Sequence, residues 1–168
     1  MTSADVLVDG YDRIREAVHD ATRKLSEDDL ALRLDPQANS IAWLIWHLTR
    51  VQDDHLAGAA GTEQVWFTQG WRDRFDLPFD DLDIGYGHSS EQVAQVRAEA
   101  ELLLGYHDSV HEQTVTYVAR LSDTDLDEII DPDWTPPVTR GVRLVSVLAD
   151  GLQHAGQAAF IRGIAERR

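Results

Sequence analysis

The stretch 39-NSIAWLIWHLTRVQDDHLAGAAG-61 carries the strongest indication of the fold. Its apolar residues recur at helical spacing, which predicts a long helix with an apolar face. Asn39 and Ser40 are both residue types that cap the N-terminus of a helix. Gly58 and Gly61 are of the type at which helices commonly end. We therefore predict a helix that begins near residue 40 and ends at one of these glycines.

Three further long segments have the same helical periodicity. They cover residues 3–25, residues 89–121 and residues 143–166. Two short acidic segments, SEDDL at 26–30 and SDTDLDEII at 122–130, each begin with a serine that can cap a brief helix. We interpret the likeness of these two segments as shared capping chemistry rather than as an internal repeat.

The connections between the long segments are uneven. Residues 61–90 have no sustained apolar face, and a connection of this length is often functional or packs over the fold. The segment DPDWTPPVTRG at 131–141 predicts a proline-rich loop. Four long helices with such connections predict an all-α fold, namely a four-helix bundle with long crossover connections. We expect residues 1–168 to form a single domain of this kind.

The charge of the chain excludes several classes of partner. Fifteen basic and 30 acidic residues give a formal net charge of −15. Such a surface repels a phosphate backbone and an anionic lipid surface, so we expect neither nucleic-acid binding nor membrane binding. No apolar run is long enough to span a bilayer, and residues 1–16 have early acids without the apolar region of a signal peptide. We therefore expect a cytoplasmic location.

The chain contains no cysteine. This composition excludes disulfides, cysteine-ligated zinc and a cysteine nucleophile together. Any thiol chemistry must therefore use a thiol that the substrate supplies.

The segment ADGLQHAGQ, residues 149–157, places Asp150 and His154 four residues apart in the last predicted helix. The two side chains differ by about 40° around a helix and lie at the margin of its apolar face. A surface ion pair at this spacing would contribute only about 0.3–0.5 kcal/mol. His47 lies at the edge of the apolar face of the second long helix, so His47, Asp150 and His154 form a candidate set of two imidazoles and one carboxylate. Three such ligands with an open position are typical of catalytic zinc, and the same set can hold iron or nickel.

A second pair of histidines offers an alternative. In GYHDSVHEQ, residues 105–113, His107 and His111 also stand four residues apart, and His107 falls on the apolar side of its helix. Helical periodicity does not choose between this pair and the first set. His55 lies within the apolar arc of its helix and could line a pocket, with a hydrogen-bonded core histidine as the alternative. His88 is interpreted as a surface residue, and so is Arg50, with the binding of a substrate carboxylate as its alternative role.

Two segments together carry a family resemblance. NSIAWLIWHLTRVQDDHL and LADGLQHAGQAAFIRG resemble the DinB-like superfamily of metal-binding four-helix bundles, and the element order agrees over nearly the whole chain. The family pattern takes one histidine from the second helix and a ligand pair from the last, which corresponds to His47, Asp150 and His154. This resemblance assigns His107 and His111 a structural or supporting role.

Within the superfamily, the segments DGYDRI and SIAWLIWHLTRVQDDH resemble those of the actinobacterial mycothiol S-transferases most strongly. The order His, acid, His also resembles that of mycothiol-dependent maleylpyruvate isomerases. Because those isomerases have an additional C-terminal domain and this chain ends at Arg168, we do not expect isomerase activity. The resemblance also implies that a homodimer is possible.

The resemblance implies an enzyme: a metal-dependent S-transferase that activates a low-molecular-weight thiol, mycothiol in the first instance, for attack on an electrophilic small molecule. The implied cofactor is a divalent metal, with Zn²⁺ expected first and Ni²⁺ or Fe²⁺ as alternatives. Asp54 and Gln157 are candidates for orienting the imidazoles or contacting substrate, and His55 for lining the pocket. Two other functions stay open: a metal-dependent hydrolase or amidase of thiol conjugates, and a bundle that binds a metal or ligand without catalysis.

Overall fold

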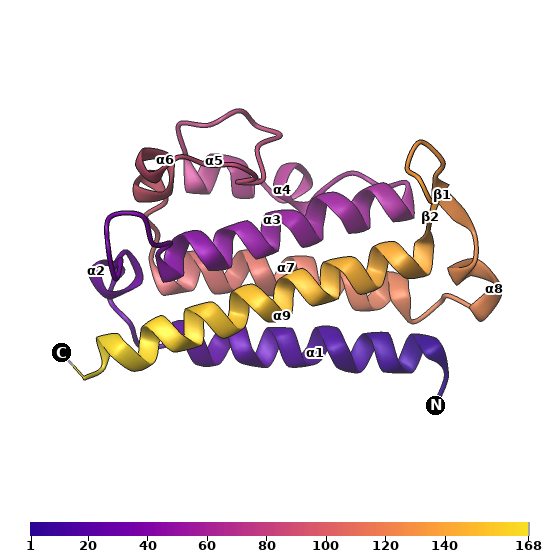
Figure 1. Ribbon diagram of the computed structural model, residues 1–168, viewed down its shortest axis with the longest axis horizontal. Helices are drawn as coiled ribbons and strands as arrows, with labels where there is room; N and C mark the ends of the chain where they lie inside the picture. Colours follow the sequence, from indigo (N-terminus) through magenta and orange to yellow (C-terminus); the bar gives the residue numbers. More distant parts are fainter. Residues whose placement is uncertain (168) are drawn as a thin grey trace.

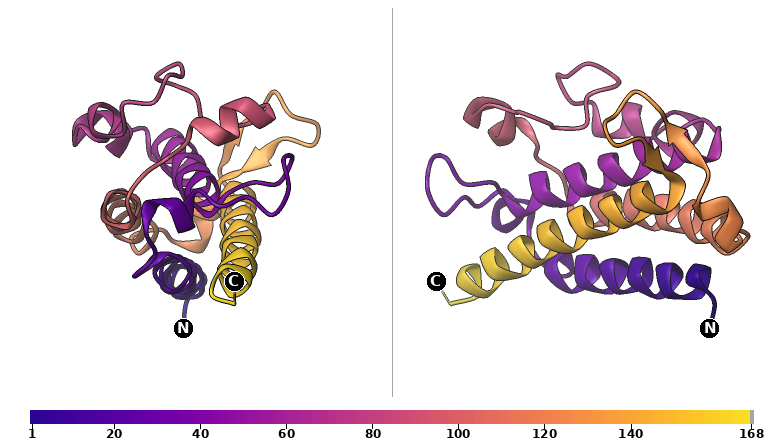
Figure 2. Two further views of the ribbon diagram at one scale, coloured as in Figure 1. Left: turned by 90° about the vertical axis from the view of Figure 1, so that its left-hand side faces the viewer. Right: turned by 45° about the vertical axis from the view of Figure 1, so that its right-hand side comes forward.

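The computed structural model describes residues 1–167, and four long helices dominate it (Figure 1). These are α1 (Ser3–Thr22), α3 (Ile41–Ala60), α7 (Ala100–Val118) and α9 (Arg140–Ala165). In the order α1, α9, α3, α7 each helix packs against the next, and α7 closes the ring against α1 (Figure 2). The predicted all-α four-helix bundle is confirmed.

The chain directions explain the two kinds of connection. Figure 1 shows α3 and α7 running the same way along the bundle, with α1 and α9 running the opposite way. Two consecutive helices that point the same way need a crossover connection, and residues 61–99 supply it between α3 and α7. The helices α3 and α9 are antiparallel neighbours, so residues far apart in the sequence meet along their shared seam.

Local capping residues set the bounds of α3. The side chain of Ser40 accepts a hydrogen bond from the backbone N–H of Trp43 at 3.1 Å, which satisfies one free donor of the first turn. Gly61 ends the helix in the left-handed conformation, at a φ of 67°. Every residue from Ile41 to Asp53 is buried, because the crossover covers the side of α3 that faces away from the bundle. The helix therefore lacks a solvent face over this length, in contrast to the single apolar face that its sequence predicts.

The crossover is more ordered than its sequence indicates. It contains α4 (Val65–Thr68), α5 (Trp71–Phe75) and α6 (Ser90–Gln95), of which only α6 lies in a segment predicted as helical. The prediction of one continuous helix over residues 89–121 is wrong, since the backbone is extended at Val96 and α7 begins only at Ala100. In the extended segment Val96 and Ala98 are buried, and Arg97 pairs with two carboxylates of α2 (Glu27–Leu30), so tertiary contacts accompany the departure from local helix propensity.

The connection between α7 and α9 stays at one end of the bundle. It contains α8 (Asp123–Leu126) and a small antiparallel hairpin in which β1 (Ile129–Asp131) pairs with β2 (Val138–Thr139). The sequence predicts only a loop for the hairpin. Complete capping boxes at Ser26 and Ser122 confirm that the two acidic segments share capping chemistry.

Arg50 is fully buried, so its interpretation as a surface residue is wrong. Its guanidinium donates to the Gln64 side chain at 2.7 Å and to the Tyr106 hydroxyl at 3.2 Å, and lies 3.7 Å from the carboxylate of Asp53. These contacts tie the crossover to the core beneath it. A buried cation without such partners would be costly.

Among the described residues, no helix combines the length and the apolarity that crossing a membrane requires.

Candidate metal centre

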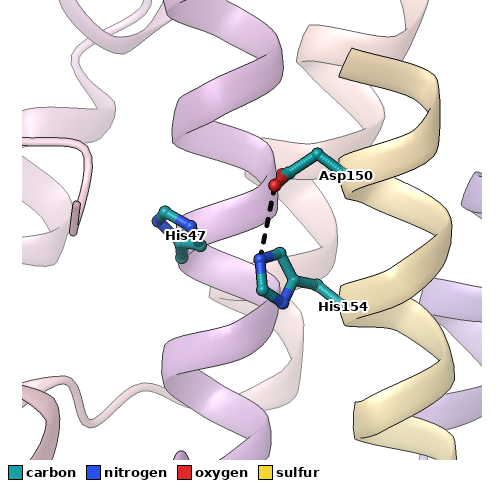
Figure 3. A group of neighbouring side chains, drawn as sticks. All are labelled: His47, Asp150 and His154. Carbon is teal, nitrogen blue, oxygen red and sulfur yellow. Dashed lines mark ion pairs between the residues drawn. The ribbon is translucent and has the colours of Figure 1, made fainter. Parts of the chain in front are cut away.

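Three side chains meet across the seam between α3 and α9. His47 extends from α3, while Asp150 and His154 extend from neighbouring turns of α9 toward it (Figure 3). One ligand atom from each residue lies within 4.8 Å of the others. Within residues 1–167, no other group of three or more histidine, aspartate or glutamate side chains meets this criterion. We call these three residues the metal trio.

His47 is held from two sides. Its Nδ1–H donates a hydrogen bond to the backbone carbonyl of Ile84, a residue of the crossover. The indole of Trp43, one turn earlier on α3, stacks on the imidazole with ring centroids 4.5 Å apart and planes inclined by 16°. The side chain is only 6% exposed, so the ring is fixed before any ligand arrives. The hydrogen bond at Nδ1 leaves Nε2 as the acceptor that faces α9.

The close approach of the crossover to His47 requires a glycine. Gly85 follows Ile84 and has a φ of 90°, which L-residues with a side chain rarely adopt. A Cβ at this position would lie 2.8 Å from Nδ1 of His47 and 2.9 Å from the ring of Trp46. Gly85 therefore lets the carbonyl of Ile84 reach the imidazole.

His154 is oriented by its own helix. Its Nδ1 lies 2.8 Å from Oε1 of Gln157, and because the amide oxygen can only accept, the imidazole donates at this atom. Its Nε2 faces Oδ1 of Asp150 at 3.5 Å, along the dashed line in Figure 3. Gln157 thus acts on His154 as the Ile84 carbonyl acts on His47.

The resulting donor set fits a cation. In their neutral forms, both imidazoles carry a proton at Nδ1 and present a lone pair at Nε2. The second carboxylate oxygen of Asp150, Oδ2, is buried and has no hydrogen-bond partner. The two lone pairs and the unpartnered buried oxygen belong to side chains whose ligand atoms lie within 4.8 Å of one another, and such a cluster of unsatisfied acceptors favours a positive charge. These groups fit a divalent metal.

The separations also approach those of a metal site. Ligand atoms about 2.1 Å from a tetrahedral zinc ion lie about 3.4 Å from one another. The largest separation in the trio is within 4.8 Å, so a shift of about 1.4 Å would bring it to the tetrahedral value. Asp150 and His154 are partly exposed, and rotation of their side chains can supply such a shift.

The pKa values of the trio reflect burial and mutual interaction. Burial lowers the pKa of His47 below its ordinary value. The hydrogen bond with Asp150 raises the pKa of His154, against the opposing effect of burial. Burial alone would raise the pKa of Asp150, but the hydrogen bond and charge of His154, with His47 and His55 nearby, hold that pKa below its ordinary value. Asp150 therefore stays ionised and available as an anionic ligand.

A second layer of contacts supports the His47 side of the site. The indole N–H of Trp43 donates to Nδ1 of His88 at 3.1 Å, and Nε2 of His88 lies 3.0 Å from the carboxylate of Asp83. The His88 side chain is only 3% exposed, so its interpretation as a surface residue is wrong. This chain of contacts fixes the crossover over α3. Its only sequence signal is the pairing of an acid with a nearby histidine in an irregular segment.

The alternative histidine pair does not form a site. His107 is fully buried, and its Nδ1 contacts the hydroxyl of Thr49 at 3.1 Å. His111 instead contacts Asp12 on α1 at 2.8 Å. The two imidazoles thus have separate partners on different helices, and the structural role that the resemblance assigns to them agrees with these contacts.

Asp54 and His55 lie on α3 two turns beyond His47 and are not part of the metal trio. They line a cavity of about 400 Å³ together with Asp131 and Arg143. Nδ1 of His55 is 3.6 Å from Asp54 and 3.4 Å from the guanidinium of Arg143. The charge of His55 nevertheless reaches Asp150 and helps to lower its pKa.

Comparison with known proteins identifies the family of the chain. A family model described as mycothiol-S-transferase matches residues 6–166, which is nearly the whole sequence. The chain belongs to the mycothiol-S-transferase family. The resemblance inferred from its two helical motifs is thereby confirmed.

A solved structure has the same fold as this family member. The entire chain superimposes with a TM-score of 0.92 on 99% of the chain in "Crystal structure of the conserved protein of locus from Enterococcus faecalis", at 30% sequence identity. No curated protein matches the sequence. The family description indicates a transferase and a thiol, and the metal trio is a group that could bind a metal ion.

Proposed function

We propose that this family member is a metal-dependent S-transferase that activates a low-molecular-weight thiol, mycothiol in the first instance, for attack on an electrophilic small molecule. The observation that carries the proposal is the cluster of Asp150, whose Oδ2 is buried without a partner, with two imidazoles whose Nδ1 atoms are already engaged. Family membership supplies the thiol and the transfer.

His47, Asp150 and His154 would hold the ion. Two neutral imidazoles and one carboxylate leave a divalent ion with a residual charge of about +1 and, at zinc, with one open coordination position. The ligand types suit Zn²⁺, whereas Ni²⁺ and Fe²⁺ also accept nitrogen and oxygen ligands of this kind. We propose zinc as the physiological metal.

A divalent ion bound there would lower the pKa of a coordinating thiol, so that the nucleophilic thiolate predominates at neutral pH. The protein's own residues prepare the site for this chemistry. The Ile84 carbonyl and Gln157 fix the tautomer of each imidazole, and Trp43 shields His47 from water by stacking on it. The absence of cysteine from the chain means that no internal thiol competes for the open position.

The first test compares metal-free protein with protein loaded with zinc. Both are incubated with mycothiol and monochlorobimane, and the fluorescent conjugate is measured over time. We expect the loaded protein to form the conjugate faster than the metal-free protein and to leave a preformed conjugate intact. Cleavage of the preformed conjugate would instead assign a hydrolase, and inactivity in both assays would leave only a binding protein.

The second test replaces one proposed ligand. The His154→Ala variant should lose zinc, measured by elemental analysis after dialysis, and should lose conjugate formation with it. His111→Ala is a matched control, because it also removes an imidazole in contact with an aspartate, at 2.8 Å, but on the α1 side of the bundle. Unchanged zinc content in His154→Ala would contradict the site, whatever happened to the activity.

A further inference from the structure

A cleft of about 540 Å³ opens beside the metal trio. It lies between the segment that leads from α2 into α3 and the C-terminal half of α9, both toward the same end of the bundle in Figure 1. Gln157, which orients His154, forms part of its wall. An occupant of the cleft therefore lies next to the metal trio. The volume falls within the range of clefts that bind small molecules.

The chemistry of the wall is selective. Its side chains are apolar, as at Leu34, Leu44 and Phe160, or carry neutral amides, as at Gln37 and Asn39. None of the lining residues is charged, although the chain as a whole has a net charge of −15. A charged ligand group would lose water here without gaining a partner of opposite sign, whereas an apolar ligand would gain by burial.

The cavity on the other side of the trio has the opposite character. It lies toward the N-terminus of α9, where Arg143 comes two helical turns before Asp150, and its wall also contains Asp54, His55 and Asp131. Charged and hydroxyl groups of a polar thiol find hydrogen-bonding partners in that cavity. The two cavities thus separate polar from apolar ligand chemistry along one seam.

We propose that the cleft beside Gln157 binds the electrophilic co-substrate, and that this co-substrate is an uncharged molecule with an apolar body. This inference rests on the proposed S-transferase function. In the reaction with a halide, the thiol sulfur forms a bond to the electrophilic carbon, the halide leaves with the electron pair of the broken bond, and the thiol proton passes to solvent. The cleft positions the carbon that reacts and buries the apolar remainder.

Gly156 provides a test that preserves the fold. It lies in the interior of α9 on the wall of the cleft, and a Cβ added there meets no atom within 4 Å. Replacing a glycine inside a helix by alanine or leucine favours the helix. Gly156→Leu therefore fills part of the cleft, and Gly156→Ala is the matched control that leaves most of it open.

The kinetic experiment uses two uncharged chlorides with different bodies: monochlorobimane, which has a bulky methylated bicyclic body, and chloroacetamide, which is small and lacks such a body. We expect Gly156→Leu to raise KM for monochlorobimane at least tenfold. The KM for chloroacetamide and for mycothiol should change less than twofold, and Gly156→Ala should raise the KM for monochlorobimane far less than Gly156→Leu does. An unchanged KM for monochlorobimane overturns the inference. A raised KM for mycothiol with both chlorides overturns it as well, because it assigns the cleft to the thiol.

A binding experiment separates this inference from the proposed function. The halogen-free syn-bimane cannot react, so its fluorescence titration of metal-free protein needs neither thiol nor transfer. We expect Gly156→Leu to bind it at least tenfold more weakly than wild type and Gly156→Ala to lose far less affinity. If wild type forms no conjugate but this pattern holds, the function fails and the cleft assignment stands. If wild type forms conjugate but all three proteins bind the bimane equally, only the cleft assignment fails.

Discussion

Replacing Gln157 by leucine should weaken zinc binding without unfolding the protein. The Gln157 amide oxygen accepts a hydrogen bond of 2.8 Å from Nδ1 of His154 and is its only hydrogen-bond partner there within the described residues. Leucine has a similar size but no acceptor, so Gln157→Leu leaves the imidazole free to rotate and to adopt the other tautomer. Nε2 is then no longer fixed as the atom that faces Asp150.

The expected loss of zinc affinity depends on how exposed the Gln157–His154 hydrogen bond is. Groups that orient metal-ligating histidines typically contribute a factor of 10–100 to metal affinity. Gln157 is exposed, and water can partly replace its amide oxygen, which places the expected effect at the lower end. We therefore expect the zinc dissociation constant to rise about tenfold, or about 1.4 kcal/mol.

The assay is competition for zinc against a chromogenic chelator at fixed pH. Gln153→Leu serves as the control, because Gln153 is exposed one turn earlier on α9 and bonds only to the backbone of its own helix. Urea unfolding of the metal-free proteins should agree within about 0.5 kcal/mol, as for other surface substitutions. If Gln157→Leu binds zinc as tightly as Gln153→Leu, Gln157 does not orient His154.

Three further predictions concern the surrounding fold. Gly85→Ala should lower the free energy of unfolding more than Gly87→Ala does. Both glycines have positive φ, so backbone strain alone should cost about 1–3 kcal/mol at each, but only at Gly85 would the Cβ crowd His47. Equal losses in urea titrations would contradict the close approach. Burial lowers the pKa of His107 to about 3. The unfolded chain takes up this proton below about pH 6.5 and the folded chain does not, so stability falls as pH decreases from about 6.5 toward 3. In the metal-free His107→Leu variant, the plot of unfolding free energy against pH should be flatter by up to about 1.4 kcal/mol per unit between pH 6 and 4, and parallel plots would refute this. Asp53→Ala should lower the free energy of unfolding, measured by heat or urea, by about 3–5 kcal/mol, because the buried Asp53 carboxylate accepts hydrogen bonds from two backbone N–H groups at 2.7 and 2.8 Å. A loss below 1 kcal/mol would show that the α4 segment does not depend on Asp53.

The long helices of the bundle follow largely from sequence periodicity, whereas the choice of the trio over the His107–His111 pair depends on the family resemblance. His47 and the Asp150–His154 pair stand at the margins of apolar faces, and the packing of α3 against α9 brings these margins together. The capping serines similarly predict where the short helices begin. These features depend on residue type at fixed spacing, which a sequence displays directly.

Other features of the site depend on groups that leave no such pattern. The acceptor for His47 is a backbone carbonyl, and any residue at position 84 would present one. The need for glycine at position 85 arises from the approach of a distant segment to α3. Arg50 and His88 are buried because partners from other parts of the chain compensate them, whereas residue type alone favours exposure for arginine. The helix break at Val96 likewise occurs beside a contact with a distant segment, the ion pair of Arg97 with Glu27 of α2.

The division of the metal trio between α3 and α9 has a consequence for the synthesis and folding of the chain. During synthesis, His47 leaves the ribosome long before Asp150 and His154 exist, so the nascent chain cannot hold an ion at this site. An ion at this site would bind only a polypeptide in which α9 has already packed against α3, since only that form offers all three donors. An ion that binds only the folded form would link segments made early and late in synthesis. It would raise the free energy of unfolding by about 2.7 kcal/mol when free metal exceeds its dissociation constant a hundredfold.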